Sequence, residues 1–532
     1  MPGKKFYLKQ NVMIEPLFNQ WYAWAYLMAP VQAAMYTANL HLKIMRSFIA
    51  NPQLHMSAVK NPAMLGGPFI NYDHTRINDI KALIERIEKE QSHVLELAEA
   101  IKNLDNTLSN EASGYSLEPL YEKVPAFLKG YVELGYDLNN HPSIRFLEGL
   151  LYKSRYFDPA LQSIALSETN RDGRPFILST PMLEDEGLLH LKLPFDHKGV
   201  DALAKARLSP CSLSEMQEAL SISDEKAELF TSFFTEQAPS QPQSYKGDGL
   251  QIRYFGHACL LIETKDVSIL TDPVISYKYD TELPRYTYCD LPETIDYVLI
   301  THSHSDHFIL ETLLQLRHRI KNVIVPRSLG GVLIDPSLKL ILQNIGFQNV
   351  RELDEMEVIE ISEGSITGLP FFGEHADLHI RSKIAYLVDL KGSTMIFAAD
   401  SNNIEPKLYE RIHDLVGDID ILFLGMECVG APLTWSYGPL LTKPLARKMD
   451  QSRRFNGSNS EKAMVMVEQL NARQVYVYAM GEEPWLTHLT SLQYTEASEQ
   501  IIESNRLLDQ CKRLNLVAER LFGKKDISLM AR

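Results

Sequence analysis

The pattern of apolar and polar positions changes near residue 240. Before it, apolar residues recur every three or four positions with charges between them, which is typical of amphipathic helices. Segments 78–108 and 212–237 are predicted as two such helices, the second with Ser212 and Ser214 as candidate N-caps. The strings RPFILST (174–180) and LLHLKLPF (188–195) are predicted to form a short hairpin between them.

After residue 249, short β-rich runs each end at a turn or a polar cluster. Examples are GLQIRYFGHACLLIET, KDVSILTDP, IDYVLITHSHSDH and STMIFAADS. The stretch APSQPQSYKGDG before them is rich in proline, serine and glycine, as linkers are. We therefore expect a mostly helical N-terminal domain over 1–240, a linker over 241–249 and an α/β domain over 250–532. A chain of 532 residues is also too long for one compact core.

Composition narrows the class of protein. Hydrophobic residues make up 45% and charged residues 23%, as in soluble globular proteins, and the formal net charge of −15 disfavours nucleic acid or an anionic membrane as partner. Five scattered cysteines without a CxxC pair fit a reducing, cytoplasmic compartment and disfavour a thiolate zinc site. The start, MPGKKFYLKQNV, has no apolar region of a secretory signal.

One apolar run, WYAWAYLMAPVQAAMYTANL from Trp21, invites comparison with a membrane span. It contains Pro30 and Gln32, so a buried helix pair broken at the proline, or a dimer surface, is the better interpretation.

The string THSHSDHF places three histidines and an aspartate directly after a buried-type strand. His302 and His304 are two apart in an extended segment and therefore point to the same side, whereas Asp306 and His307 follow where the chain turns towards helix. This spacing predicts two metal ions, one held by the HxH pair and one by the DH pair. The alternative, a polar helix cap with incidental histidines, does not explain the whole string.

Two metals need further ligands from other strand ends. The loop GLPFFGEHADLHI offers Glu374 or His375, IFAADSNN offers Asp400, and PWLTHL offers His488. Asp400 follows a buried strand, where a carboxylate suits the bridging of two cations. A helix cap remains the alternative for Asp400, and a surface histidine the alternative for His488.

The second domain resembles the metallo-β-lactamase superfamily. GHACLLIE with TDP (256–273) resembles its early hairpin and turn, and His302, His304, Asp306, His307 and Asp400 match its ligand motifs. The resemblance implies an αββα sandwich with a dinuclear site at one edge of two sheets, in most members a zinc hydrolase. A dinuclear zinc hydrolase is therefore the alternative function.

The GEH loop departs from the hydrolase pattern, which usually has histidine there. Glu374 and the long helical N-terminal domain resemble the diiron β-hydroxylases of nonribosomal peptide biosynthesis. That resemblance implies two iron ions in an oxo-bridged cluster. One would be held by His302, His304 and Glu374, the other by Asp306 and His307, with Asp400 bridging or shared. Three carboxylates without a thiolate also favour iron over zinc. Glu374 and Asp400 are the predicted catalytic pair, and His488 a further ligand matched by order alone.

The resemblance further implies O2 as cosubstrate and β-hydroxylation of an amino acid held as a thioester on a peptidyl carrier protein. The amino acid stays open between aromatic side chains and aliphatic ones such as leucine. Without a GxGxxG motif or a cysteine cluster, electrons are expected from a separate reductase. The chain is expected to be a homodimer. Five basic residues are predicted to cover the site and meet the carrier, with a solvated surface as the alternative: Lys443, Arg447, Lys448, Arg453 and Arg454.

Overall fold

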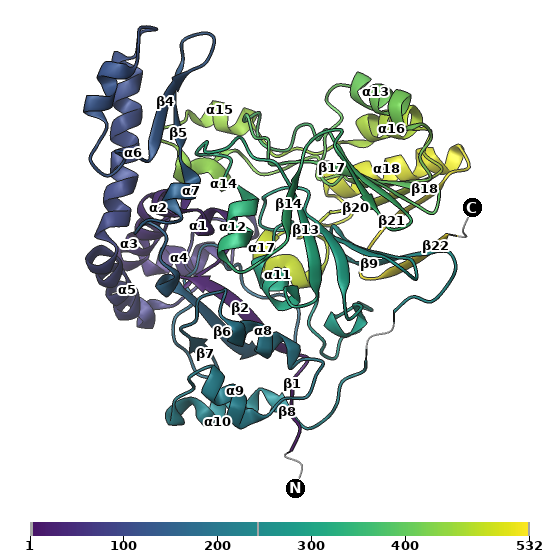
Figure 1. Ribbon diagram of the computed structural model, residues 1–532, viewed down its shortest axis with the longest axis horizontal. Helices are drawn as coiled ribbons and strands as arrows, with labels where there is room; N and C mark the ends of the chain where they lie inside the picture. The colour runs from purple at the N-terminus through teal and green to yellow at the C-terminus, as the bar shows by residue number, and fades with distance from the viewer. Residues whose placement is uncertain (1–3, 242–243, 530–532) are drawn as a thin grey trace.

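The computed structural model describes residues 4–241 and 244–529 (Figure 1). Its C-terminal part is built on two seven-stranded sheets. The first has the order β14-β13-β12-β11-β10-β9-β22 and the second the order β15-β16-β17-β18-β19-β20-β21. Both sheets mix antiparallel and parallel pairs; β11, β12, β13 and β14 run parallel in the first, and β18 to β21 in the second.

The strands of the first sheet are β9 (Leu250–Gly256), β10 (Cys259–Glu263), β11 (Ser268–Thr271), β12 (Ile295–Leu299), β13 (Ile320–Pro326), β14 (Val350–Leu353) and β22 (Lys525–Leu529). Those of the second are β15 (Val358–Ile361), β16 (Gly364–Leu369), β17 (Ala385–Leu390), β18 (Ser393–Phe397), β19 (Ile421–Gly425), β20 (Gln474–Tyr478) and β21 (Val517–Arg520). The last strand returns to the first sheet, where β22 pairs with β9 and so ties the chain's end to the domain's first strand.

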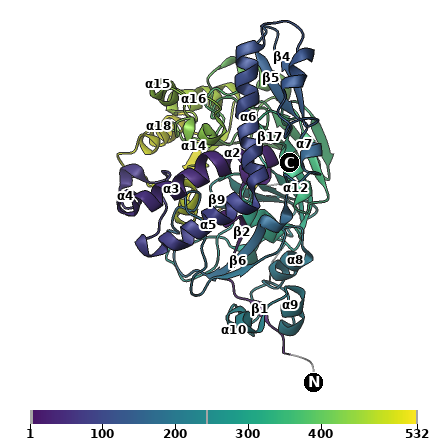
Figure 2. The ribbon, with the colours of Figure 1, turned by 90° about the vertical axis from the view of Figure 1, so that its left-hand side faces the viewer.

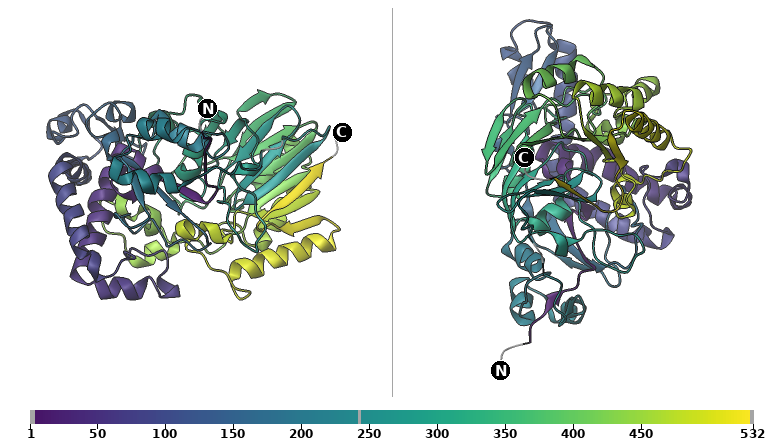
Figure 3. Two further views of the ribbon diagram at one scale, coloured as in Figure 1. Left: turned by 90° about the horizontal axis from the view of Figure 1, so that it is seen from below. Right: turned by 90° about the vertical axis from the view of Figure 1, so that its right-hand side faces the viewer.

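Apolar residues from both sheets meet in one buried layer. Ile252 and Ile262 of the first sheet lie in the same core cluster as Tyr386 and Phe423 of the second. Seen from below, the two sheets lie face to face and helix α18 runs along one outer side (Figure 3).

Helices cover the outer faces. The first sheet is covered by α11 (Leu310–Leu316) and α12 (Leu338–Asn344), and the second by α13 (Lys407–Val416), α16 (Ser460–Gln469) and α18 (Glu499–Arg513). This is the predicted αββα sandwich. Three short helices lie in the connections: α14 (Thr434–Tyr437), α15 (Arg447–Ser452) and α17 (Thr487–Thr490).

The N-terminal part combines helices with small sheets. The helices are α1 (Ala25–Met28), α2 (Pro30–Tyr36), α3 (Leu42–Ala50), α4 (Pro52–Ala58), α5 (Ile77–Glu90), α6 (Ser92–Glu111), α7 (Glu148–Leu151), α8 (Lys198–Lys205), α9 (Leu213–Ala219) and α10 (Asp224–Ser232). The strands are β1 (Tyr7–Leu8), β2 (Val12–Phe18), β3 (Trp21–Tyr22), β4 (Val132–Tyr136), β5 (Pro142–Phe146), β6 (Gln162–Glu168), β7 (Leu189–Leu191) and β8 (Phe234–Thr235). Figure 2 shows how α5 and α6 form the outside of this part.

The segment from Trp21 is the predicted buried helix pair. Helix α1 ends before Ala29 and Pro30 occupies the first turn of α2, where its missing N–H costs nothing. Every side chain of both helices is buried within the chain. The alternative of a dimer surface is therefore wrong for this segment. Within the described residues, no helix is both long and apolar enough to cross a membrane.

Three local predictions change. The amphipathic stretch 78–108 is two helices that meet at Gln91, and the stretch 212–237 is α9, capped by Ser212, followed by α10. RPFILST forms no strand, and β7 pairs instead with β6. Part of the predicted linker, residues 242 and 243, lies outside the described residues, and β9 begins at Leu250.

Candidate metal centre

The histidine motif lies in the turn between β12 and α11. Thr301 is tied to the second sheet, because its carbonyl accepts the backbone N–H of Ile384 at 2.8 Å, and His302 forms a β-bridge with Lys383. His302 and His307 are fully buried. The motif is therefore held where the two sheets meet.

Three overlapping groups of side chains have their ligand atoms within 4.8 Å of one another. They are His302 with His304 and Glu374, His302 with His307 and Asp400, and His257 with Asp306 and His307. His302 and His307 each belong to two groups, so the three groups are contiguous. Contiguous groups that share ligands can hold two adjacent cations, as the sequence pattern predicts.

Two of the three carboxylates come from strand ends of the second sheet. Glu374 follows β16 and Asp400 follows β18. One Glu374 oxygen lies 2.9 Å from His304 Nδ1 and the other 3.7 Å from His302 Nε2, while an Asp400 oxygen lies 3.1 Å from His307 Nε2. Glu374 thus faces the HxH pair, and Asp400 lies between His307 and His302, 3.9 Å from His302 Nε2.

The loop that carries Glu374 is strained. Glu374, Ala376 and Asp377 all have φ between 52° and 61°, the left-handed region that such residues seldom adopt. Strain of this kind persists only where surrounding structure enforces it, and it gathers at functional sites. Here Lys383 donates to the Gly373 carbonyl at 3.1 Å and Arg453 donates to the Ala376 carbonyl at 2.9 Å, which fixes the loop.

The electrostatics of the groups suit cations. Burial, together with the neighbouring His307 and His304, holds the pKa of His302 well below its usual range, so its imidazole is neutral and can bind metal. Burial raises the pKa of Glu374, but the charges of His304 and His375 outweigh it and lower the pKa to about 2. His302 Nε2 and Asp400 Oδ1 are buried without a hydrogen-bond partner among the described residues. Buried polar atoms left in this way fit a pair of bound metal ions.

Two supporting residues orient the histidines. Asp272 accepts from His307 Nδ1 at 2.8 Å and from the Thr301 hydroxyl at 2.6 Å. The Tyr437 hydroxyl lies 3.1 Å from His304 Nε2. A metal-binding histidine commonly has its second nitrogen held by such a partner, which fixes both tautomer and ring orientation.

His375, the alternative to Glu374, lies beside the groups. Its ring stacks on His304 with centroids 4.5 Å apart, and its Nδ1 is 3.0 Å from a Glu374 oxygen. His375 belongs to none of the three groups found among the described residues. Both ring nitrogens of His375 are buried without a hydrogen-bond partner among the described residues, so His375 stays the alternative ligand of this loop.

His257 was not among the predicted ligands. It follows β9 in the string YFGHAC, has φ of 52°, and its Nε2 lies 3.4 Å from an Asp306 oxygen and 3.2 Å from His307 Nε2. The signal was available, because a histidine at a strand end is the same feature that singled out Asp400.

His488, the predicted further ligand, lies elsewhere. Its Nε2 is 3.1 Å from Arg174 Nη1 and 3.9 Å from a Glu311 oxygen, and burial with the charge of Arg174 holds its pKa well below the usual range. Arg174 also pairs with Glu15, so this buried cluster joins the N-terminal part to α11. The structure thus corrects the ligand set by placing His488 in an ion cluster between the two parts of the chain.

Exchange of either histidine for alanine tests this correction. We expect His257→Ala to lose about half of the bound iron, because it removes a donor from the group with Asp306 and His307. His488→Ala should keep the iron content of the unaltered protein. Metal analysis of both variants after anaerobic iron loading is the measurement, and iron loss confined to His488→Ala would reverse the assignment.

Comparison with known proteins assigns the class. Residues 7–239 match the family model described as diiron non-heme beta-hydroxylase N-terminal domain, and residues 251–477 match the beta-lactamase superfamily domain. The chain is 37% identical over 535 residues, or 99% of its own length and 100% of the relative's, to a Streptomyces venezuelae protein. The chain belongs to the diiron β-hydroxylase family, and the zinc-hydrolase alternative is less supported.

The relative is named 4-amino-L-phenylalanyl-[CmlP-peptidyl-carrier-protein] 3-hydroxylase. The crystal structure of CmlA, a diiron β-hydroxylase from Streptomyces venezuelae, superposes with a TM-score of 0.93 at 36% identity, covering 99% of this chain and all of that one. The similarity therefore includes the N-terminal part as well as the sandwich.

Proposed function

We propose that this chain uses O2 to hydroxylate the β-carbon of an amino acid held as a thioester on a peptidyl carrier protein. The observation that carries the proposal is similarity over the whole chain to a hydroxylase whose name specifies a carrier-bound aminoacyl substrate. The three groups of ligand atoms that include Glu374 support it. The proposed iron ligands are His302, His304, Glu374, Asp306, His307 and Asp400, with His257 in place of His488.

The bound iron pair would supply the activation of O2. The chain's own residues provide a shielded and ordered site. Asp272 and Tyr437 hold the imidazoles of His307 and His304, and the Phe371 ring lies 5.4 Å from that of His302. Because His302 and His307 are fully buried, bulk water is kept from the reacting centre.

Hydroxylation by O2 needs an electron donor. One oxygen atom enters the C–H bond and the other leaves as water, which consumes two electrons and two protons. The five cysteines are free thiols, and none of them belongs to a group of potential metal ligands among the described residues, so no iron–sulfur cluster is indicated as an electron source. A separate reductase is part of the proposal, as are a homodimer and a cytoplasmic location.

Intact-mass spectrometry of carrier-bound amino acids tests the proposal. Reduced protein is incubated with 18O2 and carriers loaded with aromatic or leucyl residues. We expect one 18O atom in one aminoacyl carrier and none in the same amino acid free in solution. Release of the amino acid from its thioester without oxygen gain would contradict hydroxylation and support the hydrolase.

A further inference from the structure

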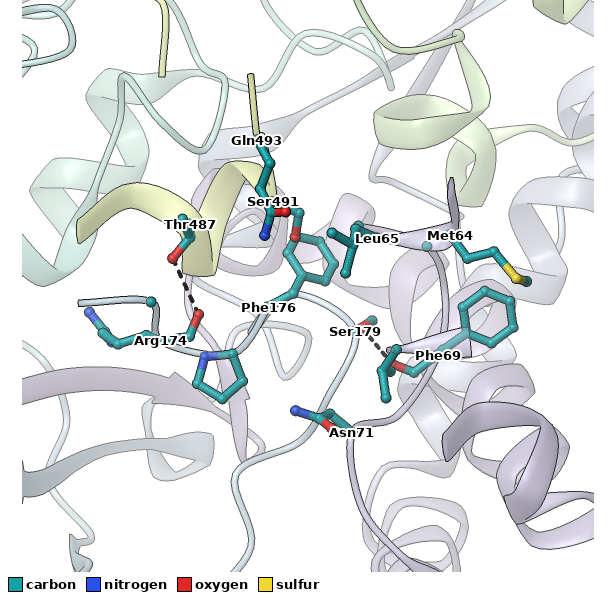
Figure 4. Close-up of a pocket in the computed structure, with 15 residues that line it drawn as sticks. Met64, Leu65, Phe69, Asn71, Arg174, Phe176, Ser179, Thr487, Ser491 and Gln493 are labelled. Carbon is teal, nitrogen blue, oxygen red and sulfur yellow. Dashed lines mark hydrogen bonds between the residues drawn. The ribbon is translucent and has the colours of Figure 1, made fainter. Parts of the chain in front are cut away.

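A cavity of about 180 Å³ lies where the two parts of the chain meet. It is bounded by the loop 59–71, the segment 173–179 and the C-terminal segment 487–493 (Figure 4). Its residues are outside the metal groups and outside the ion cluster around Glu311, apart from Arg174 at its edge. The cavity has no role in the site described above.

The cavity is lined by apolar side chains and by two side chains that carry amides. Met64, Leu65 and Phe176 provide apolar surface, while Asn71 and Gln493 bring carboxamides (Figure 4). A pantetheine chain has the matching chemistry, because it carries a dimethyl group, a hydroxyl and two amides in a narrow linear molecule. Pockets of this mixed character bind flexible organic ligands by burial of apolar groups and a few directional hydrogen bonds.

Helix α14 contacts both the edge of the cavity and the metal centre. At its start, Trp435 Nε1 donates to the Gly66 carbonyl at 3.1 Å, and a Cβ on Gly66 would lie 3.7 Å from the same nitrogen. At its end, the Tyr437 hydroxyl lies 3.1 Å from His304 Nε2. The edge of the cavity and the first metal group therefore contact two residues of the same short helix, Trp435 and Tyr437.

Helix α15 lies next to α14 at the surface. Asp450 of α15 accepts from both the backbone N–H and the hydroxyl of Thr434, each at 2.9 Å. Met449 is 52% exposed and Trp435 is 38% exposed, so each helix presents an apolar side chain to solvent, and Trp435 also contacts the edge of the cavity through Gly66.

The five basic residues of this region divide into two sets. Arg453 bonds to the Ala376 carbonyl, Arg454 to Gln451, and Lys443 to Ser109. Arg447 and Lys448 are exposed on α15 and make no ion pair with any described residue. On a chain of net charge −15, two such cations beside exposed Met449 and Trp435 suit an acidic partner.

We propose that the carrier protein docks on the surface formed by Trp435, Arg447, Lys448 and Met449, and that its pantetheine arm enters the adjacent cavity. This inference rests on the proposed function. The phosphodiester that joins the arm to the carrier is anionic, so Arg447 and Lys448 would meet negative charge at the root of the arm. The arm would then pass α14, the helix that contacts His304.

Charge reversal tests the docking surface. Arg447→Glu with Lys448→Glu is expected to weaken binding of an aminoacyl carrier by about tenfold or more and to reduce its salt dependence, because two attractive charges become repulsive. The matched control is Lys512→Glu with Arg513→Glu, another adjacent exposed pair at the end of α18. Dissociation constants at two salt concentrations are measured on iron-loaded protein. Equal affinity of both double variants would overturn the surface.

Thiol exchange tests the cavity. A carrier whose pantetheine thiol is activated as its thiopyridyl disulfide reacts with a protein thiol, forming a mixed disulfide and releasing thiopyridone. Gln493→Cys is expected to react about tenfold faster than Lys512→Cys, because the docked arm raises the local thiol concentration. The unaltered protein gives the background of the native cysteines. Equal rates at positions 493 and 512 would overturn the cavity assignment.

These results are separable from failure of the proposed function. If the unaltered protein hydroxylates an aminoacyl carrier while both sets of variants behave as their controls, the function stands and the docking site is wrong. If carrier binding depends on Arg447 and Lys448 but no aminoacyl carrier gains oxygen, the surface stands and the proposed reaction is wrong.

Discussion

Exchange of Glu374 for alanine is expected to abolish hydroxylation and to empty the first of the two iron positions. Glu374 supplies the only carboxylate in the group with His302 and His304. Without it, two neutral imidazoles remain in a buried site and cannot offset the charge of a cation. Loss of a residue that merely supports a ligand lowers metal affinity by about 10–100-fold, so loss of the ligand itself should cost more.

Two neighbours in the same strained loop serve as controls. His375→Ala removes the alternative ligand, and Asp377→Asn removes an exposed carboxylate that also has a left-handed backbone. Iron content per chain and oxygen incorporation into the aminoacyl carrier are measured for all three variants. Full iron in Glu374→Ala together with loss in His375→Ala would assign the loop's ligand to the histidine.

The local part of the metal centre could be predicted from the sequence because its residues are neighbours in the chain. Alternation along a strand fixes the common direction of His302 and His304 whatever the rest of the fold does. Asp400 was found for a related reason, since a carboxylate directly after a buried strand has no packing role there. Such signals need no knowledge of which strands are adjacent.

The remaining assignments depended on strand order, which the sequence does not specify. His257 and His488 both follow strand ends, yet β9 ends beside the metal groups while His488 faces Arg174 and Glu311. Arg174 comes from a segment more than 300 residues earlier in the chain. No periodicity predicts that contact, because it arises only when the N-terminal part covers α11.

In the N-terminal part too, the sequence predicted local structure but not long-range pairing. Apolar periodicity predicted that 78–108 is helical, but not the antiparallel pairing of β2 with β6, which joins Val12 to Glu168. That pairing brings Glu15 of β2 towards Arg174 and Glu311. Long-range pairing of this kind determines how the helical part is fastened to the sandwich.

Exchange of Asp400 for asparagine should impair both iron positions. Asp400 belongs to the group that shares His302 with the first position and His307 with the second. One of its oxygens lies 3.1 Å from His307 Nε2 and 3.9 Å from His302 Nε2, and the other has no hydrogen-bond partner among the described side chains. Asparagine keeps the shape but removes the negative charge and one acceptor oxygen, so neither cation is fully compensated.

The expected result is iron content below about half of that in the unaltered protein, with hydroxylation lost. Asp272→Asn provides a graded comparison, because Asp272 contacts His307 at Nδ1 and bonds to Thr301 without joining any metal group. Its loss should lower iron affinity by only about 10–100-fold and spare iron at saturating concentrations. Titration of the metal-free variants with ferrous iron separates the two outcomes. A bridging carboxylate must affect both positions, so Asp400→Asn protein that retained one fully occupied position would place Asp400 on a single ion.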